Sequence, residues 1–416
     1  MKFGLIGEKL PHSYSKVIFE ELLGYPRYDL VELKREELAA FFKTFDYDGL
    51  NITVPYKTDV MPYLDEIDDI AKEIGAVNTV RKENGKLYGT NTDFYGLRGL
   101  LTGRGIDLAG KTVLILGTGG TSRTAAAVCR SLGAKEIYRV SRTGKEGAIS
   151  YAKAKEIPAQ WILNTTPVGM FPNTDAAPVD LTEFSSPEGV VDVIYNPLRT
   201  ALVRQAKSLG LTAVSGLYML AAQAIAAEKI FLGAGWSESA LAERTEKIYR
   251  ALRERTENLV LIGMPAVGKT TVGKRLAKQT GRAFYDTDTE LEKKIGPIPD
   301  FIRRFGEASF RERETETIRE LCKAVRGAVI ATGGGAVLRE ENARALGENG
   351  VLFWLHREAD ASILSDSRPL SSDVERWRTL YQTREPYYQK ASDFCVFGYQ
   401  TPEEAVETIM KEYQTW

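Results

Sequence analysis

Cysteine and histidine are both scarce in this 416-residue chain. Its three cysteines, Cys129, Cys322 and Cys395, are widely spaced, and none belongs to a C-x-x-C pair. Sparse, unpaired cysteines indicate reduced thiols rather than a disulfide framework, which is typical of the cytoplasm. The two histidines, His12 and His356, are too few for a histidine-rich metal site.

Long apolar runs and an excess of one charge are also missing. The most apolar stretch, 216–235, contains Gln223, Glu228 and Lys229, whereas a membrane-spanning helix needs ~20 residues almost free of charge. The first ten residues lack the apolar core of a signal peptide. The net charge of -1 argues against nucleic acid or an anionic membrane as the main partner. We therefore expect a soluble, cytoplasmic protein whose partners are small molecules.

Short apolar runs alternate with helix-compatible segments, which predicts an α/β fold with mainly parallel sheets. At ~150 residues per domain, the length predicts two or three domains. We expect one α/β unit at 1–100, with helices of 216–255 packing back on it, a second at 101–215 and a third at 257–416. The sequence predicts strands at 3–7, 49–54, 111–116, 136–140, 161–164, 190–194 and 258–262, and helices at 34–45, 65–74, 218–232 and 238–255.

A phosphate-binding motif opens the last unit. Residues 263–270 read GMPAVGKT, a complete G-x-x-x-x-G-K-[ST] between an expected strand and an expected helix. In such a P-loop, backbone N–H groups cradle polyphosphate, here with Lys269 at the β- and γ-oxygens and the Thr270 hydroxyl on Mg²⁺. In this context a chance Gly-rich turn is the weaker interpretation. The motif predicts ATP binding by Gly263, Val267, Gly268, Lys269, Thr270 and Thr271.

Further short motifs follow in a fixed order: DTD at 286–288, FGEASFRERE at 305–314, ATGGG at 331–335, RPL at 368–370 and REPY at 384–387. Together they resemble the shikimate kinase family over essentially the whole unit. The resemblance implies a P-loop small-molecule kinase that phosphorylates shikimate with ATP and Mg²⁺. The segment 357–384 is shorter than the family's lid, and it has no match for the family's adenine-stacking arginine.

The resemblance also assigns roles. Asp288 would bind the acceptor hydroxyls and take the proton of the attacking one, and Asp286 would join Thr270 at Mg²⁺. Two arginine forks would hold the acceptor carboxylate, and a third arginine would clamp the transferring phosphoryl group. Three glycines would let backbone approach the ligand. The two arginine forks are Arg311 and Arg384, the arginine that clamps the phosphoryl group is Arg368, and the three glycines are Gly333, Gly334 and Gly335.

A second Gly-rich turn follows the expected strand at 111–116. Residues 117–122 read GTGGTS, a G-x-G-x-x-S variant of the dinucleotide-binding loop, which predicts a Rossmann-like domain. An NAD site would place an acidic residue at the end of the second strand, where this chain has cationic and hydroxyl side chains. These favour the 2′-phosphate of NADP, although Arg142 could also be merely exposed. The predicted contacts are Gly117, Gly119, Gly120, Thr121, Ser141, Arg142, Thr143 and Lys145.

Seven other motifs of the first half resemble shikimate dehydrogenase over nearly its whole length. They are HSYS at 12–15, NITVPYK at 51–57, GAVNT at 75–79, GTNTD at 89–93, NTTPVGM at 164–170, YNP at 195–197 and GLYMLAAQ at 216–223. The resemblance implies that Lys57 and Asp93 handle the proton at the C3 oxygen. It implies a carboxylate site at Ser13 and Ser15, a hydroxyl site at Thr53, Asn78 and Gln223, a further substrate contact at Tyr195, and cofactor contacts at Thr165 and Met219.

Two departures from this family stand out. Lys16 replaces the usual proline after the Ser-x-Ser pattern. The stretch 143–163 is barely long enough for the helix that normally follows the second strand, so we expect a trimmed cofactor domain in which Trp161 helps to cover the gap. For His12 we expect loop scaffolding rather than a chemical role.

The two resemblances imply consecutive reactions, in which NADPH reduces 3-dehydroshikimate to shikimate and ATP then phosphorylates the same C3 hydroxyl. Two alternatives remain. The first half could be an NAD-linked quinate/shikimate dehydrogenase. One half, the kinase with its short lid more than the other, could be a non-catalytic binding or regulatory module.

Overall fold

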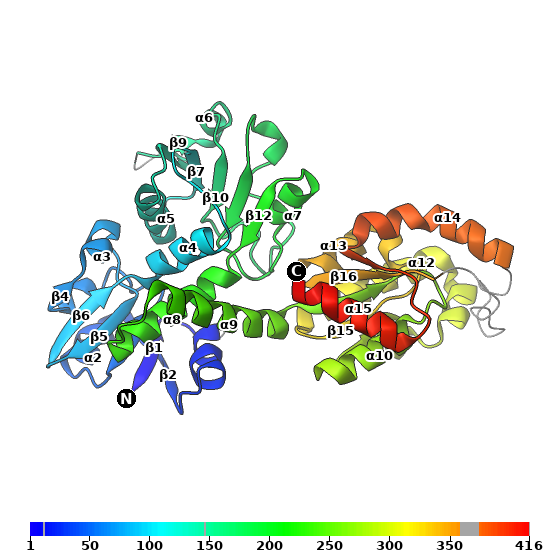
Figure 1. Cartoon of the computed structure of the whole chain (residues 1–416), viewed down its shortest axis with the longest axis horizontal. Coiled ribbons are helices and arrows are strands. Elements are labelled where there is room, and N and C mark those ends of the chain that lie inside the picture. Colours follow the sequence, from blue (N-terminus) through cyan, green and yellow to red (C-terminus); the bar gives the residue numbers. More distant parts are fainter. Residues whose placement is uncertain (11–12, 145–146, 358–373, 416) are drawn as a thin grey trace. The chain divides into compact units, whose positions relative to one another are not determined.

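The computed structural model describes residues 1–10, 13–144, 147–357 and 374–415 (Figure 1). The chain forms two compact units, Met1–Leu252 and Arg253–Trp416. Helix α9, Glu238–Thr256, belongs to both of them. Within the described ranges, no helix is both long and apolar enough to cross a membrane.

The first sheet of unit 1 has the order β2-β1-β3-β5-β6-β4. Strand β1 pairs in parallel with β2 and β3, but β5 pairs antiparallel with both β3 and β6. The sheet is therefore mixed. Strands β5 and β6 form a hairpin that turns at Asn84 and Gly85, both at positive φ, and this hairpin was not predicted. The bounds are β1 Phe3–Gly7, β2 Tyr28–Glu32, β3 Gly49–Ile52, β4 Glu66–Ile67, β5 Thr79–Glu83 and β6 Lys86–Thr90.

Short helices connect these strands, and the longer helices α8, Leu217–Leu232, and α9 pack against the sheet. Helices α8 and α9 share a core with β1, in which Phe3 and Leu5 meet Ile225, Ile248 and Leu252. The short helices are α1 Tyr14–Lys16, a π-helical segment Val17–Leu22, 3₁₀ turns at Arg35–Glu37 and Met61–Tyr63, α2 Leu38–Lys43 and α3 Asp69–Ile74; the longer ones are α4 Thr92–Gly103 and α8 Leu217–Leu232.

Helices α4 and α8 pack closely at Gly96. A Cβ on Gly96 would lie 2.8 Å from Cβ of Gln223 and 2.9 Å from the carbonyl oxygen of Met219. Only glycine therefore allows this approach, which brings the second turn of α4 beside the first two turns of α8.

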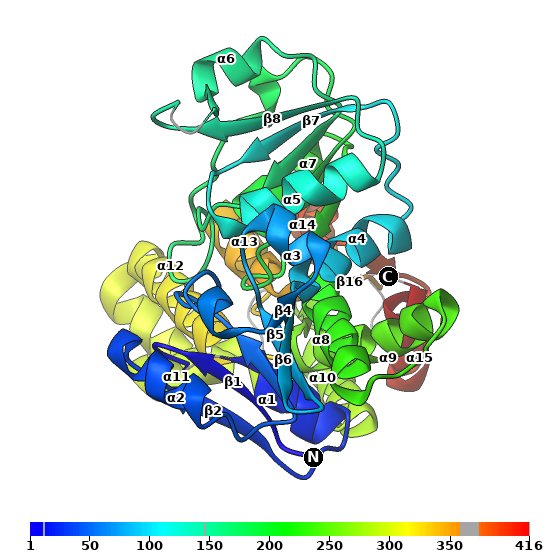
Figure 2. The same ribbon diagram turned by 90° about the vertical axis from the view of Figure 1, so that its left-hand side faces the viewer.

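The second sheet of unit 1 is fully parallel, in the order β12-β11-β10-β7-β8-β9. Figure 2 shows β7 and β8 of this sheet with helix α5 beside them. The strands are β7 Thr112–Leu116, β8 Glu136–Ser141, β9 Ile149–Ser150, β10 Trp161–Asn164, β11 Gly189–Asp192 and β12 Thr212–Ser215; the helices are α5 Gly120–Ser131, α6 Tyr151–Lys155 and α7 Ala201–Ser208, with a 3₁₀ turn at Leu181–Glu183.

Helix α6 has only five residues, in keeping with the short stretch after β8. The expectation that Trp161 covers the gap is wrong. Trp161 packs with Val113 and α5 on one face of the sheet, whereas Ala154 of α6 packs with Ile162 on the other. Alternation along β10 sends Trp161 away from the shortened helix.

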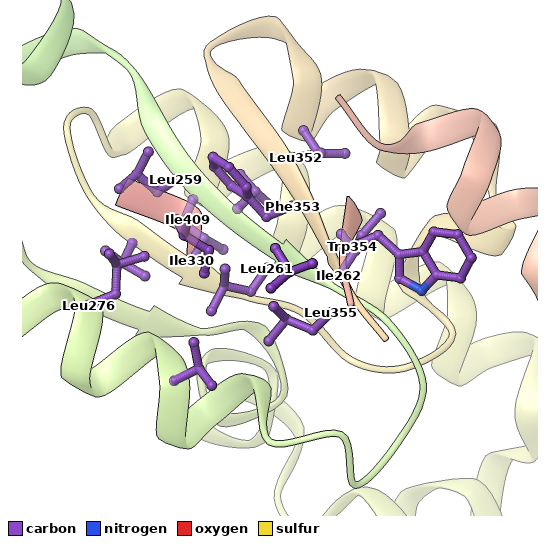
Figure 3. Close-up of a cluster of buried hydrophobic side chains, with 14 of the residues drawn as sticks. Leu259, Leu261, Ile262, Leu276, Ile330, Leu352, Phe353, Trp354, Leu355 and Ile409 are labelled. Atoms are coloured by element: carbon purple, nitrogen blue, oxygen red, sulfur yellow. The ribbon is translucent and has the colours of Figure 1, made fainter. Parts of the chain in front are cut away.

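Unit 2 is built on a five-stranded parallel sheet in the order β14-β15-β13-β16-β17. All five residues of β13 are buried, and Leu259 and Leu261 lie among Ile330, Leu276 and Ile409 (Figure 3). Continuous burial fits a central strand covered on both faces. The strands are β13 Asn258–Ile262, β14 Phe284–Asp286, β15 Val329–Ala331, β16 Gly350–Leu355 and β17 Phe394–Val396.

The helices of unit 2 flank this sheet (Figure 1). Helix α12 is broken at Gly306, whose φ of 83° and ψ of 163° are not helical. The bounds are α10 Lys269–Thr280, α11 Thr287–Ile295, α12 Ile298–Ala324, a 3₁₀ turn at Ala336–Leu338, α13 Glu340–Glu348, α14 Val374–Ala391 and α15 Pro402–Thr415.

Candidate active sites

Unit 1 contains a cavity of about 510 Å³ beside the ends of β1 and β3. It gathers residues that are far apart in the sequence, from the loop after β1, the turn after β3, helix α4 and helix α8. Every residue predicted for proton handling or substrate contact in this unit lines it, together with two predicted cofactor contacts: Ser13, Ser15, Thr53, Lys57, Asn78, Asp93, Tyr195 and Gln223, then Thr121 and Met219.

Lys57 and Asp93 form an ion pair in this cavity, with Lys57 Nζ 2.6 Å from Asp93 Oδ2. Their side chains are 27% and 18% exposed, so both are shielded but reachable. The carbonyl of Lys57 accepts from the Val77 N–H at 2.7 Å. The N–H of Asp93 donates to Asn91 Oδ1, the N-cap of α4, at 3.1 Å. Backbone hydrogen bonds at Lys57 and at Asp93 therefore hold the pair in place. Such a pair can transfer a proton to or from an oxygen atom of a ligand.

Asn78 is held with its amide oxygen fully used. Its Oδ1 accepts from the Thr92 N–H at 2.6 Å and from the Thr79 and Thr92 hydroxyls at 3.1 Å each. The Asn78 NH₂ group donates to no other residue in the described ranges and is therefore available to a ligand in the cavity. Asn51 supports this arrangement, because its Nδ2 donates to the Thr79 hydroxyl at 3.0 Å and its Oδ1 accepts from the Tyr28 hydroxyl at 2.8 Å.

Tyr195 contributes a protonated hydroxyl to the same cavity. Its ring meets the edge of Tyr14 at 5.8 Å between centroids. Burial, with Tyr14 adding to it, raises the pKa of the Tyr195 hydroxyl above its ordinary value. The group therefore stays a hydrogen-bond donor for an anionic ligand throughout the neutral range.

The Gly-rich loop lies between the ends of β7 and β10, where the strand order of the second sheet reverses. Gly117 has a φ of 110°, and its Cβ position lies 3.0 Å from Thr165 Oγ1. No atom of the described residues lies within 4 Å of a Cβ on Gly119 or Gly120, so that side of the loop is open. The buried Ser122 hydroxyl donates to the Gly117 carbonyl at 2.7 Å. This bond braces the loop and gives a reason for serine at the third motif position.

The predicted 2′-phosphate residues begin with Ser141, the last residue of β8, which is the neighbour of β7. Ser141 Oγ accepts from the Gly144 N–H at 2.9 Å and so shapes the turn. Arg142 and Thr143 are exposed. Lys145 lies outside the described residues. Thr165 directs its hydroxyl to the Leu116 carbonyl at 2.6 Å, which gives it a structural use beside the loop.

The P-loop of unit 2 joins β13 to α10. Lys269 is 8% exposed, and its Nζ donates to the carbonyls of Gly263 and Met264 at 2.8 and 2.7 Å. Gly263 has a φ of 140°, and a Cβ on this residue would lie only 2.5 Å from the Leu355 carbonyl oxygen. Val267 packs in the core. Neither Gly263 nor Val267 lines the cavity beside the loop, so an ATP contact by either residue stays a prediction.

That cavity has a volume of about 760 Å³. It collects residues from the P-loop, α11, α12, the loop after β15, and α14. The predicted residues that line it are Gly268, Lys269, Thr270, Thr271, Asp286, Asp288, Arg311, Gly333, Gly334, Gly335 and Arg384. Arg368 lies outside the described residues.

Thr270 and Asp286 form the predicted metal pair, with Thr270 Oγ1 donating to Asp286 Oδ2 at 2.7 Å. The other oxygen of Asp286 accepts from the Asp288 N–H at 3.1 Å and caps α11. Within the described part of the chain, no three His, Cys, Asp or Glu residues are grouped for a metal. One hydroxyl and one carboxylate fit Mg²⁺, which takes its other ligands from phosphates and water.

Three glycines separate the functional side chains at the base of the cavity. A Cβ would lie 2.5 Å from Asp288 Oδ1 at Gly333, 2.6 Å from Pro265 Cδ at Gly334, and 2.6 Å from Arg311 Nη1 at Gly335. The resemblance to shikimate kinase predicts that these glycines admit the ligand. The structure gives them a further use, because Gly333 leaves room for the Asp288 carboxylate, Gly335 for the Arg311 guanidinium group and Gly334 for Pro265.

Glu314 forms an ion pair with Arg311, and sequence analysis gave Glu314 no role. Its Oε2 accepts from Arg311 Nη1 at 3.0 Å. Glu314 is 3% exposed, and its burial raises the pKa of its carboxyl, against which Arg311 acts. Arg384, the second predicted carboxylate ligand, donates to the Gly334 carbonyl at 3.3 Å. Spacing from Arg311 could have identified Glu314, because residues i and i+3 share a helix face.

Comparison with known proteins supports both resemblances. The family model for the shikimate dehydrogenase substrate binding domain matches residues 5–80. A shikimate dehydrogenase (NADP(+)) of Clostridium beijerinckii is 37% identical over 264 residues, which are 59% of this chain and 96% of that protein. The chain belongs to the shikimate dehydrogenase family. The shikimate kinase family model matches residues 265–414, so the second unit is a shikimate kinase domain.

Solved structures resemble the dehydrogenase unit. A chorismate mutase/shikimate 5-dehydrogenase fusion protein from Clostridium acetobutylicum is 35% identical, with a TM-score of 0.57 over 61% of this chain and 97% of that chain. Shikimate 5-dehydrogenase of Thermus thermophilus, in complex with NADP(H) and shikimate, is 31% identical, with a TM-score of 0.51 over 60% and 99%. The mixed α/β architecture of the dehydrogenase unit is thus shared with relatives.

Sequence reasoning missed some of the residues at the dehydrogenase cavity. Lys9, Leu10 and Asn51 also line it. Asn51 opens one of the quoted motifs, but nothing local shows that its side chain supports Asn78. Lys9 stands just after the first strand, and that position was the only available signal.

Proposed function

We propose that the first unit reduces 3-dehydroshikimate to shikimate with NADPH. The observation that carries this proposal is the Lys57–Asp93 pair, 2.6 Å apart in a cavity lined by six other polar residues predicted for the substrate. NADPH, when bound, supplies the hydride. The Lys57 ammonium group donates the proton to the C3 oxygen, while Asp93 orients Lys57 through their ion pair.

The names of the relatives support NADP as the cofactor. The open face of Gly119 and Gly120 fits a pyrophosphate at the start of α5. Arg142 stands where an NAD-linked enzyme would present a carboxylate, which disfavours the NAD-linked quinate/shikimate alternative. Oxidation of shikimate by the whole chain, compared with NADP⁺ and NAD⁺ and with quinate as the second substrate, tests both versions.

Reversing the charge at Arg142 should change the cofactor preference. We expect Arg142→Asp to raise the KM for NADPH about tenfold, because an exposed charge-assisted phosphate contact is lost and a repulsive carboxylate replaces it. The KM for NADH should stay nearly constant. Lys135→Asp makes the same charge change before the opposite end of β8 and should alter neither value. An unaltered NADPH/NADH ratio in Arg142→Asp would exclude Arg142 as the 2′-phosphate ligand.

We further propose that the second unit transfers the γ-phosphoryl group of ATP to the C3 hydroxyl of shikimate. Support comes from the family model and from a cavity that holds Lys269, the Thr270–Asp286 pair, Asp288 and two arginines. Asp288 accepts the proton of the attacking hydroxyl, and Arg311 and Arg384 bind the carboxylate. Lys269 and Mg²⁺ neutralise the phosphate charge, with Thr270 and Asp286 holding the ion.

A direct assay separates this proposal from the non-catalytic alternative. The whole chain is given shikimate, ATP and Mg²⁺ without a nicotinamide cofactor, and shikimate 3-phosphate is measured. Product formation that needs Mg²⁺ supports a working kinase. Shikimate binding without product would favour a binding or regulatory module.

Gly335→Ala tests the acceptor side of the kinase site. The new Cβ would lie 2.6 Å from Arg311 Nη1 and must displace the guanidinium group. We expect the KM for shikimate to rise about tenfold with little change in the KM for ATP, since one bidentate carboxylate contact is lost. Gly347→Ala places a Cβ in open space and serves as the control. Equal changes in both KM values would mean that the substitution disturbs the whole domain.

A further inference from the structure

The dehydrogenase cavity has a charged lining residue that the proposed chemistry leaves unused. Among the described lining residues, Lys9, Lys57 and Asp93 carry charge. Lys57 and Asp93 compensate each other at 2.6 Å. Lys9 therefore gives the lining a net formal charge of +1 before any ligand binds.

The backbone around Lys9 is fixed on both sides. The Leu10 N–H donates to Glu32 Oε1 at 2.8 Å. A Cβ on Gly7 would lie 2.8 Å from both Leu10 Cδ2 and Thr53 Cγ2, so the end of β1 packs against this segment and against the turn that carries Thr53. The base of the Lys9 side chain is thereby held at the cavity rim.

The Lys9 side chain itself is exposed, and it makes no hydrogen bond or ion pair with any residue in the described ranges. Lys16 gives a contrast seven residues later. Its Nζ lies 3.9 Å from Glu20 Oε1, and it does not line the cavity. Of these two lysines, only Lys9 can bind a ligand in the cavity without first breaking an ion pair with a carboxylate of the protein.

Ser13 and Ser15 line the same cavity and can donate hydrogen bonds, but they supply no charge. A carboxylate that leaves water for a protein cavity needs a cation as well as hydrogen bonds. We propose that Lys9 is the counter-ion of the substrate carboxylate and makes the enzyme prefer anionic over neutral ring substrates. This inference rests on the proposed dehydrogenase function and adds a specificity-determining residue to it.

The test compares shikimate with its uncharged methyl ester as substrates for NADP⁺-linked oxidation by the whole chain. We expect Lys9→Met to raise the KM for shikimate about fivefold, as for a partly exposed ion pair, with kcat within about twofold. The KM for the ester should not respond to the substitution. Lys9→Arg should keep the wild-type KM for shikimate, and added salt should raise that KM in wild type more than in Lys9→Met.

Lys16→Met is the matched control and should leave both KM values unchanged. An unchanged KM for shikimate in Lys9→Met would overturn the proposal. A rise that is equal for the acid and the ester would also overturn it, because Lys9 would then act on the loop and not on the carboxylate. If wild type oxidises neither substrate, the proposed function fails instead, so the two failures are distinguishable.

Discussion

Replacing Lys57 with methionine is expected to lower kcat for the reduction of 3-dehydroshikimate by about 10³-fold, the middle of the range for loss of a general acid. Methionine keeps the length of the side chain and removes its proton and charge. Because Lys57 lies 2.6 Å from Asp93 in a cavity of unit 1, the substitution should leave shikimate phosphorylation in unit 2 unchanged. Disappearance of NADPH and formation of shikimate 3-phosphate from supplied shikimate, measured on one preparation, check both statements.

Lys72→Met is the control for this substitution. Lys72 is 61% exposed, lies 3.5 Å from Asp69 and does not line the cavity. Asp93→Asn should also slow the reduction strongly, since Lys57 then loses the carboxylate that orients it. The assignment of Lys57 fails if Lys57→Met keeps more than about a tenth of the wild-type kcat. A comparable fall in both activities would contradict the independence of the two units.

The strands that precede the two Gly-rich loops could be predicted because of their burial. Residues 113–116 and 259–262 are uninterrupted apolar runs, and in the structure they belong to central strands covered on both faces. Each run is followed at once by glycines and then by a helix. Local sequence is therefore enough to indicate a phosphate-binding turn, because the turn needs only neighbouring residues.

The hairpin of β5 and β6 shows a signal that was present and overlooked. Asn84-Gly85 is a strong two-residue turn signal, and both residues have positive φ, 50° and 80°. It adds the antiparallel pairings of β5 with β3 and β6 to a sheet whose other pairings are parallel. Trp161 shows the opposite case. Its alternation with Ile162 is visible in the sequence, but which face α6 would cover depends on how the chain crosses the sheet.

The contacts between distant segments could not be predicted. Gly335 is glycine because Arg311, 24 positions earlier, places its guanidinium group 2.6 Å from where a Cβ would be. Lys9 and Gln223 meet at one cavity although more than 200 residues separate them. Motif resemblance brought most of these residues to notice, but it gave no geometry and passed over Lys9, which belongs to no motif.

For the second unit, Asp288→Asn is expected to lower kcat for shikimate phosphorylation by at least ~10²-fold. Asparagine has the same shape, so it should still fit the 2.5 Å approach of Asp288 Oδ1 to the Cβ position of Gly333. The Asp288 N–H, which donates to Asp286 Oδ1 at 3.1 Å, is not altered, so the start of α11 and the Thr270–Asp286 pair should remain. What is lost is the carboxylate that accepts the proton of the attacking hydroxyl. ATP binding, followed by equilibrium titration, should therefore stay near wild type while turnover falls.

Asp300→Asn, at an exposed residue paired with Arg303 at 3.0 Å, is the control. The dehydrogenase rate of the same sample reports that unit 1 is intact. Turnover that remains within tenfold of wild type would show that Asp288 is not the proton acceptor, whereas parallel loss of ATP binding would show that it holds the P-loop side of the site instead.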